Sequence, residues 1–210
     1  VKQVGTGASL GSGLVLDTNM NVYLTGRLEN TTILRKYNTA GTQLWSNTIP
    51  GPTYNFYDKP HPISIVNNTI CVATTSSHRA YSTTGSYIGG GSLAATSISS
   101  VGKSSFLLAN NTHLRFVNSN LNLGPVYFVP DSISTVNHAV SKDGFIYLTG
   151  MLDGTAVFGS DTLSGYRDIF IAKLDSSTGN FVWATQGYGT TSADEGYSIV
   201  LGDSNEIYLA

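Results

Sequence analysis

Short runs in which apolar and polar residues alternate recur along the chain, and one kind of run returns five times. In each copy a few apolar residues stand between polar residues that are typical of turns. Alternation with a period of two predicts β-strands, and we find no helical period of convincing length. The five copies are Asn21–Gly26, Thr69–Thr74, Ser105–Asn110, Gly144–Gly150 and Glu206–Ala210. The pattern therefore predicts an all-β protein built from a repeated unit.

The residues around each copy predict four strands per unit. A short strand such as Gly13–Asp17 precedes the copy and ends in a polar hairpin turn. A third strand follows, such as Ile33–Tyr37 or Ile169–Leu174, and a turn then leads to a fourth strand. The fourth strand carries Trp45 in one unit and Trp183 in another, whereas the middle units lack a Trp. Successive copies lie 48, 36, 40 and 61 residues apart. Periods of roughly 40–50 residues are typical of propeller blades, so four antiparallel strands per unit predict a β-propeller with inserted loops in the longest spacing.

We expect the whole chain, residues 1–210, to be a single β-propeller or a propeller fragment. The four predicted complete blades span approximately 12–50, 62–91, 96–130 and 134–187, and the partial blades span 1–7 and 194–210. The ends allow two interpretations. The chain is either a piece of a longer propeller, which we favour, or a five-bladed ring whose last blade joins residues 1–5 to the C-terminal strands. Closure of the second kind would remove exposed sheet edges, but the joined blade would lack its third strand.

The C-terminal part of the chain has a longer recognisable string. Its pieces are Asp143–Gly150, Phe158–Gly159, Asp168–Asp175, Gly179–Ala184 and Asp194–Ile199. Over residues 134–210 this string resembles the SBBP repeats, a bacterial β-propeller repeat family, and residues 1–50 resemble the same family more loosely. The resemblance implies a surface or secreted protein of bacteria, and it supplies no catalytic residues.

One segment also resembles a second kind of repeat. Residues 173–183 are similar to the repeat of quinoprotein-type propellers, in which Asp, Thr-Gly and Trp dock one blade on the next. That family includes quinone-dependent dehydrogenases and assembly scaffolds without enzymatic activity. The resemblance implies a structural role for Trp183.

Charge and cysteine content narrow the classes of function. The chain has 210 residues, 11% of them charged, with 11 Lys and Arg against 13 Asp and Glu. We therefore expect no nucleic-acid partner, because no basic block is present to neutralise phosphates. We also expect no membrane insertion, because no run reaches about 18 apolar residues. Cys71 is the single cysteine, and its place on a predicted inner strand favours a packed thiol over a nucleophile.

The sequence offers no catalytic residues, no metal site and no cofactor site. Its four histidines are scattered over different units without metal-ligand spacing. The neighbours Asp194 and Glu195 suggest acid–base chemistry, but their place before an inner strand favours a turn or an inter-blade hydrogen-bonding role. Residues 89–91 are three glycines, which we interpret as loop residues rather than a phosphate cradle.

The candidate ligand-binding region is the long connection between residues 50 and 62. It is rich in aromatic side chains, which sugar rings and partner proteins stack on. The residues that we assign to this site are Tyr54, Phe56, Tyr57 and His61 of the connection, with His78 and Arg79, which we expect on a loop between a second and a third strand at the same face. The alternative is that the aromatic residues pack over the edge of a blade.

These observations favour a non-enzymatic β-propeller module, extracellular or at the cell surface, that serves adhesion, surface assembly or scaffolding. A polar surface made of Ser, Thr, Asn and Gly fits that location, and the loop face would bind a protein or a carbohydrate. The alternative is a lectin-like propeller that binds carbohydrate or peptide. A third hypothesis is a fragment of a quinoprotein-like or glycoside-acting enzyme, for which glycoside chemistry requires two carboxylates roughly 5–9 Å apart.

Overall fold

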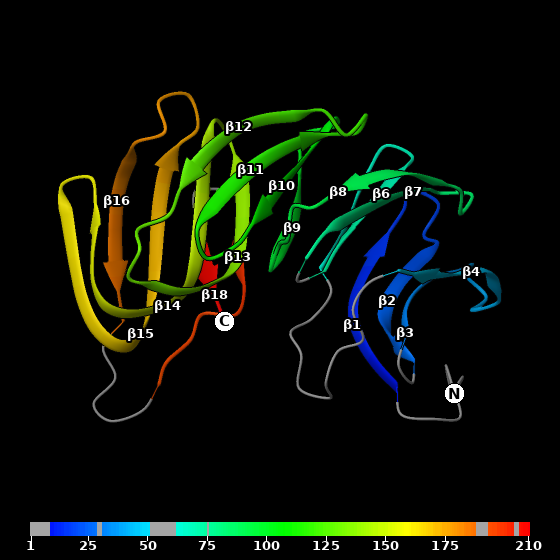
Figure 1. Cartoon of the computed structure of the whole chain (residues 1–210), viewed down its shortest axis with the longest axis horizontal. Helices are drawn as coiled ribbons and strands as arrows, with labels where there is room; N and C mark the ends of the chain where they lie inside the picture. The colour runs from blue at the N-terminus through cyan, green and yellow to red at the C-terminus, as the bar shows by residue number, and fades with distance from the viewer. Residues whose placement is uncertain (1–8, 29–30, 51–61, 75, 188–192, 204–205) are drawn as a thin grey trace. The chain divides into compact units, whose positions relative to one another are not determined.

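The computed structural model shows an all-β chain of propeller-type blades (Figure 1), as the sequence predicts. It describes residues 9–28, 31–50, 62–74, 76–187, 193–203 and 206–210. These residues form four four-stranded antiparallel sheets and one two-stranded sheet. The chain divides after Thr96 into two compact units, which are described separately below.

The first unit contains two blades whose strands pair in chain order. The first blade consists of β1 (Ser9–Leu16), β2 (Val22–Leu28), β3 (Thr31–Tyr37) and β4 (Gln43–Ile49). The second consists of β5 (Ile63–Val66), β6 (Thr69–Ala73), β7 (His78–Ser82) and β8 (Tyr87–Gly91). The core of this unit lies between the two blades and includes Tyr23, Leu34, Ile49, Ile70, Val72 and Tyr81.

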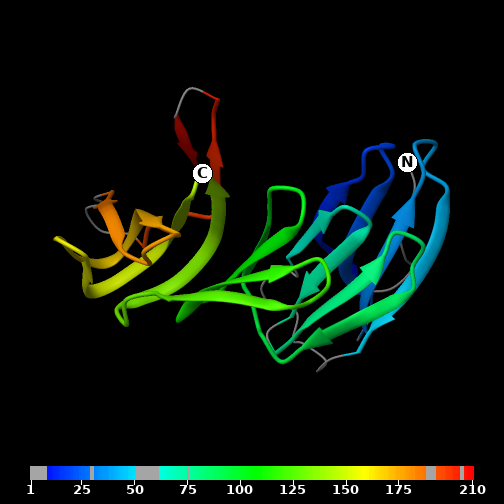
Figure 2. The same cartoon turned by 90° about the horizontal axis from the view of Figure 1, so that it is seen from above.

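The second unit contains two further blades and a hairpin (Figure 2). Its first blade consists of β9 (Ser97–Val101), β10 (Ser105–Ala109), β11 (His113–Asn118) and β12 (Leu123–Phe128). Its second consists of β13 (Ile133–Lys142), β14 (Phe145–Phe158), β15 (Asp161–Asp175) and β16 (Phe181–Gln186). The hairpin, red in Figure 2, consists of β17 (Ile199–Leu201) and β18 (Ile207–Leu209). The predicted partial blade at residues 1–7 lies outside the described residues.

The strands β14 and β15 are longer than the sequence pattern predicts. The expected inner strand ended near Gly150, but pairing between β14 and β15 continues from Asp153↔Tyr166 to Phe158↔Asp161. The extension is held by Phe158, which is fully buried. Its ring centroid lies 5.8 Å from that of Phe170 and 5.0 Å from that of Phe181. Aromatic packing therefore stabilises a hairpin whose glycines and turn residues indicate a loop.

The three glycines at 89–91 lie in strand β8, so their interpretation as loop residues is wrong. Gly90 pairs with Arg79 on the neighbouring strand. A Cβ atom at Gly90 would lie 2.3 Å from the carbonyl oxygen of His78. Glycine is used here because the two backbones approach too closely for a side chain.

The turn between the third and fourth strands has the same construction in all four complete blades, and we call it the capped turn. A polar residue opens it and accepts backbone N–H groups through its side-chain oxygen. These opening residues are Asn38, Ser82, Asn118 and Asp175. Three or four residues later the backbone has a positive φ, at Gly41, Gly85, Leu121 and Gly179. The same local chemistry therefore ends every third strand.

Candidate functional site

The structure describes only part of the predicted site. Tyr54, Phe56, Tyr57 and His61 lie outside the described residues, so their assignment stays a prediction. His78 and Arg79 are described, and their expected place on a loop is wrong, because both belong to strand β7 and pair with Ala73 and Val72 of β6.

His78 is held in the interior. Its side chain is buried, and its Nδ1 atom lies 3.3 Å from the carbonyl oxygen of Leu93. Burial lowers the pKa of His78, and the nearby charge of Arg79 lowers it further. Consecutive residues of a strand point to opposite faces, so His78 and Arg79 do not present one common surface.

Arg79 lines a pocket of about 310 Å³ in the first unit. The other residues that line this pocket are Asn47, Thr48, Pro50, Tyr81, Gly85 and Tyr87. Asn47 comes from β4, and its side-chain amide donates a 2.7 Å hydrogen bond to the carbonyl oxygen of Gly85. This bond fixes the wall that the first blade contributes, and we call the whole feature the Arg79 pocket.

The guanidinium of Arg79 has only some of its hydrogen-bond donors paired within the described residues. Its Nη1 atom donates a 3.1 Å hydrogen bond to the hydroxyl of Tyr87, and its Cζ atom lies 5.9 Å from the centre of the Tyr87 ring. Its Nε atom is buried and has no hydrogen-bond partner among the described residues. A buried donor without an acceptor is costly, so a movement of the Arg79 side chain that brings Nε to a ligand oxygen would be favoured.

Two tyrosines form the aromatic side of the pocket. Tyr81 and Tyr87 lie edge to face, with ring centroids 5.5 Å apart. Tyr81 is buried, and burial raises the pKa of its phenol, which therefore stays neutral near pH 7. Tyr87 is 54% exposed and offers ring surface to solvent. The arrangement combines a cation, a neutral hydroxyl and an exposed aromatic face, which are groups that bind a carboxylate on an otherwise polar ligand.

The sequence predicted Arg79 as a site residue but not Tyr81, Tyr87 or Asn47, which line the same pocket. The sequence pattern could have indicated Tyr81, because Arg79 and Tyr81 are two positions apart on one strand and so share a face. Tyr87 is the partner of Tyr81 across the β7–β8 hairpin. Asn47 comes from a different blade, and no local pattern connects it to Arg79.

The carboxylate of Glu195 has a structural role in the second unit. It accepts a 2.9 Å hydrogen bond from Thr135 Oγ1 and a 2.8 Å hydrogen bond from Asn137 Nδ2. The backbone N–H of its neighbour Asp194 donates to the carbonyl oxygen of Arg167 at 2.7 Å. These bonds tie the segment before β17 to the preceding blade and confirm the expected hydrogen-bonding role.

The packed character of Cys71 is also confirmed. Its side chain has no exposed surface, and burial raises the pKa of the thiol to about 12. Within the described ranges, no three or more His, Cys, Asp or Glu residues gather closely enough to bind a metal ion. The same part of the chain has no helix with the length and hydropathy needed to cross a membrane.

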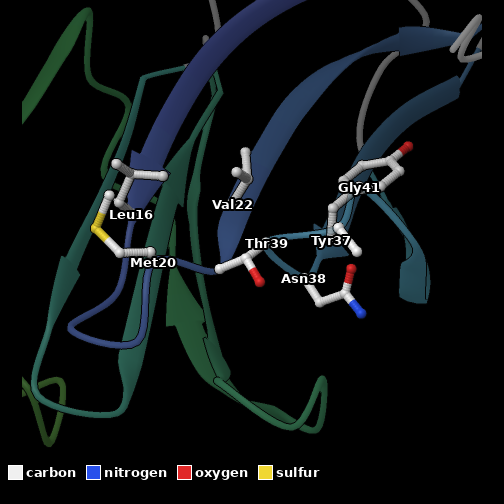
Figure 3. A pocket seen from close by; sticks show the side chains of 8 residues that line it. Leu16, Met20, Val22, Tyr37, Asn38, Thr39 and Gly41 are labelled. Atoms are coloured by element: carbon white, nitrogen blue, oxygen red, sulfur yellow. The ribbon is translucent and has the colours of Figure 1, made fainter. Parts of the chain in front are cut away.

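A second, more open pocket of about 740 Å³ lies beside the capped turn of the first blade (Figure 3). Leu16, Met20 and Val22 form one side, and residues 37–41 form the other. Leu16 is 43% exposed and Met20 is 59% exposed. No charged residue lines this pocket, and its polar side chains, Tyr37, Asn38 and Thr39, all belong to the side formed by residues 37–41.

Known proteins are similar to this chain in structure but not in sequence. No family model matches the sequence, and no curated protein matches it. The structure is similar to a protein of unknown function from Bacteroides caccae, with a TM-score of 0.56 and 14% identity over 89% of this chain and 69% of that one. It is similar to virginiamycin B lyase from Staphylococcus aureus, with a TM-score of 0.60 and 12% identity over 96% of this chain and 66% of the lyase.

A third similar structure is the quinohemoprotein alcohol dehydrogenase from Comamonas testosteroni, with a TM-score of 0.56 and 9% identity over 95% of this chain and 39% of the dehydrogenase. The chain therefore has the β-propeller fold and spans about two thirds of the first two structures. Identities of this size show a shared fold and no shared activity. The SBBP resemblance is not supported by a family model and stays a prediction.

Proposed function

We propose that the chain is a non-enzymatic β-propeller module, extracellular or at the cell surface, that serves adhesion or surface assembly by binding an acidic carbohydrate in the Arg79 pocket. The observation that carries this proposal is the Arg79 guanidinium, which lines the pocket beside the exposed Tyr87 ring and has an Nε donor without a partner among the described residues. A uronic acid would place its carboxylate on the guanidinium and its ring on the tyrosine.

The chemistry of the pocket supports binding rather than turnover. The described residues that line it include no carboxylate, histidine or cysteine, so the lining provides no acid–base pair for a reaction. Arg presents its N–H groups in a planar fork that matches a carboxylate, whereas the tyrosine ring stacks on the apolar face of a sugar. The chain has few charged residues, which agrees with recognition of the sugar by one guanidinium and one tyrosine ring rather than by a broad charged surface.

The test is calorimetric titration of the chain with uronic-acid oligosaccharides and with neutral oligosaccharides of the same length. We expect binding of the acidic series only. Arg79→Met should weaken it by about tenfold or more, because a charge-assisted hydrogen-bond pair is lost. Arg79→Lys should rescue it only in part, because an ammonium group lacks the planar fork.

Arg115→Met is the matched control. Arg115 also has a buried Nε atom without a partner among the described residues, but it lies on β11 and outside the pocket. Its replacement should leave the affinity unchanged. Equal binding of acidic and neutral sugars, or equal loss in the two variants, would contradict the proposal. Selective binding of peptides with a free carboxylate, with no sugar bound, would replace the carbohydrate by a peptide ligand.

A further inference from the structure

The Arg79 pocket contains one side-chain atom that can only accept a hydrogen bond. Arg79 itself provides donors alone. The hydroxyls of Thr48, Tyr81 and Tyr87 can each donate and accept, and two further lining residues are a proline and a glycine without polar side-chain atoms. Among the described residues that line the pocket, only the amide oxygen of Asn47 is restricted to accepting. A ligand in this pocket therefore meets one fixed demand for a donor.

The orientation of the Asn47 amide is set by a contact with the second blade. Its Nδ2 atom donates a 2.7 Å hydrogen bond to the carbonyl oxygen of Gly85. The nitrogen must occupy this position, because two oxygens placed there would repel each other. The Oδ1 atom takes the other position, where it keeps some exposed surface and accepts no hydrogen bond from any residue that the structure describes. The pocket thus has an oriented acceptor without a partner from the described part of the chain.

The capped turn that orients Asn47 is itself held by the first blade. Lys36 Nζ and Trp45 Nε1 each donate a 3.2 Å hydrogen bond to the carbonyl oxygen of Thr83, which directly follows the opening residue of the turn. Gly85 lies against the indole, where an added Cβ would be 3.1 Å from Trp45 Cδ2. Because these contacts fix the turn, they also fix the oxygen to which the Asn47 amide bonds.

The second unit holds a capped turn in a similar way. The hydroxyl of Tyr127, on β12, donates a hydrogen bond to the carbonyl oxygen of Ser176. Ser176 follows the opening residue of the turn between β15 and β16, and Gly179 of that turn lies against the Tyr127 ring. An aromatic donor therefore fixes a capped turn in each unit, Trp45 in the first and Tyr127 in the second. Such a turn is a rigid support for a residue that bonds to it.

A ligand that satisfies the pocket has two different groups. A carboxylate pairs with the Arg79 guanidinium, and a hydroxyl donates to Asn47 Oδ1. Both groups must belong to one small unit, because the pocket volume of about 310 Å³ is near the lower end of the range for ligand sites. A uronic acid has its carboxylate and its hydroxyls on a single ring. An ether or ester oxygen cannot replace the hydroxyl, because it would bring a second acceptor to Asn47.

We propose that Asn47 selects uronic acids with a free hydroxyl at one ring position and rejects those in which this hydroxyl is absent, methylated or acetylated. The inference rests on the proposed function, because it takes an acidic sugar as the ligand. Arg79 recognises the charge of the sugar, and Asn47 recognises its hydroxyl. The pocket then distinguishes an unsubstituted acidic polysaccharide from the same polymer carrying a substituent at that position.

The test is calorimetric titration with methyl glucuronide and methyl galacturonide, followed by the 2-deoxy, 3-deoxy and 4-deoxy analogues of the sugar that binds more tightly. We expect the unaltered chain to bind at least one analogue about fivefold more weakly, because the hydrogen bond to Asn47 is lost. The O-methyl ether at that position should bind no better. Asn47→Leu should weaken the parent sugar by a similar factor and should bind the parent and the sensitive analogue equally.

Asn111→Leu is the matched control. Asn111 Nδ2 also donates a 2.7 Å hydrogen bond to a carbonyl oxygen, that of Ser134, but this residue lies outside the pocket. Its replacement should leave the affinity for every sugar unchanged.

Two results would overturn the role of Asn47 alone. One is equal affinity of the unaltered chain for the parent sugar and all three deoxy analogues, a measurement that needs no substitution. The other is an Asn47→Leu variant that weakens the parent and the sensitive analogue by the same factor, because Asn47 would then only support the turn. If neither glycoside binds to the unaltered chain, the proposed function is wrong and the role of Asn47 is wrong with it.

Discussion

One capped turn has a leucine at the positive-φ position where the other three have glycine. Three of the four capped turns have glycine where φ is positive, but the turn between β11 and β12 has Leu121 there, with a φ of 67°. A left-handed conformation brings the Cβ of an L-residue too close to the backbone and costs roughly 1–2 kcal/mol. Leu121 therefore stores strain at a place where its three counterparts store none.

Leu121→Gly should raise the free energy of unfolding by about 0.5–1 kcal/mol, because relief of the strain exceeds the extra chain entropy of glycine. Urea denaturation followed by circular dichroism measures the change. The reverse substitution, Gly85→Ala, should destabilise the chain, because it adds strain and crowds Trp45. A Leu121→Gly chain that unfolds at lower urea concentration than the parent would show that packing of the leucine outweighs its strain.

At the scale of elements, the β17–β18 hairpin is held by polar contacts to the preceding blade. The backbone N–H of Ile199 donates a 3.0 Å hydrogen bond to Nδ1 of His138 on β13. Glu195 and Lys142 supply the charged contacts: Glu195 accepts from Asn137, and Lys142 donates to the carbonyl oxygen of Gly202. The histidine contact requires a lone pair on Nδ1, which only the neutral ring provides.

Attachment of the hairpin should weaken in acid. Burial lowers the pKa of His138 below its ordinary value of 6.5, so the folded protein resists protonation that the detached state accepts. The contribution to stability is complete above pH 6.5 and is lost as the pH falls through the lowered pKa. Hydrogen exchange at the Ile199 amide, corrected for intrinsic rates, should therefore be faster at pH 5 than at pH 7.5.

His138→Asn tests the cause of that pH dependence. An asparagine oxygen at the position of Nδ1 still accepts the Ile199 N–H but does not titrate, so the dependence should disappear. His113→Asn serves as the control, because His113 lies on β11 and bonds to Thr112 instead. An unchanged pH dependence in His138→Asn would mean that another group controls the hairpin.

For the whole molecule, the low content of charge predicts weak sensitivity to salt. Only 11% of residues are charged and the net charge is −2. The ion pair between Lys36 and Asp17, 3.7 Å apart, is partly buried and so less exposed to screening. Between low salt and 1 M NaCl, the free energy of unfolding in urea should change by less than about 0.5 kcal/mol. A change of more than about 1 kcal/mol would indicate charge networks that the composition does not suggest.

How far the sequence predicted this structure depends on which forces act at each place. The inner strands, the polar turns and the fourth-strand positions of Trp45 and Trp183 follow from local alternation and turn chemistry, and the structure confirms them. The β14–β15 extension was missed because its stability comes from burial of Phe158 rather than from its own pattern. Tyr127 was missed as a counterpart of Trp45 because its role depends on a contact with another blade.

The candidate site was predicted to a smaller extent for the same reason. Arg79 was assigned from its expected place on a loop between second and third strands, and the structure places it on β7 beside Tyr81 and Tyr87. Asn47 belongs to the pocket only because β4 of one blade meets the capped turn of the next. Sites formed where two repeats meet require three-dimensional information, because the residues that form them are distant in the chain.

Lys36 Nζ and Trp45 Nε1 of the first blade both donate hydrogen bonds to the carbonyl oxygen of Thr83 in the second blade. This contact between blades has an evolutionary consequence, because its acceptor is a main-chain atom. Every amino acid possesses that atom, so substitutions at the accepting position leave the acceptor in place. A blade such as the first contains both the donor side chains and a capped turn. A gene segment that encodes it can therefore be duplicated, and the new blade has the donors and the acceptor of the contact. Repeats of this kind can therefore diverge in sequence while neighbouring blades still pack together, so the fold is retained after sequence identity has been lost.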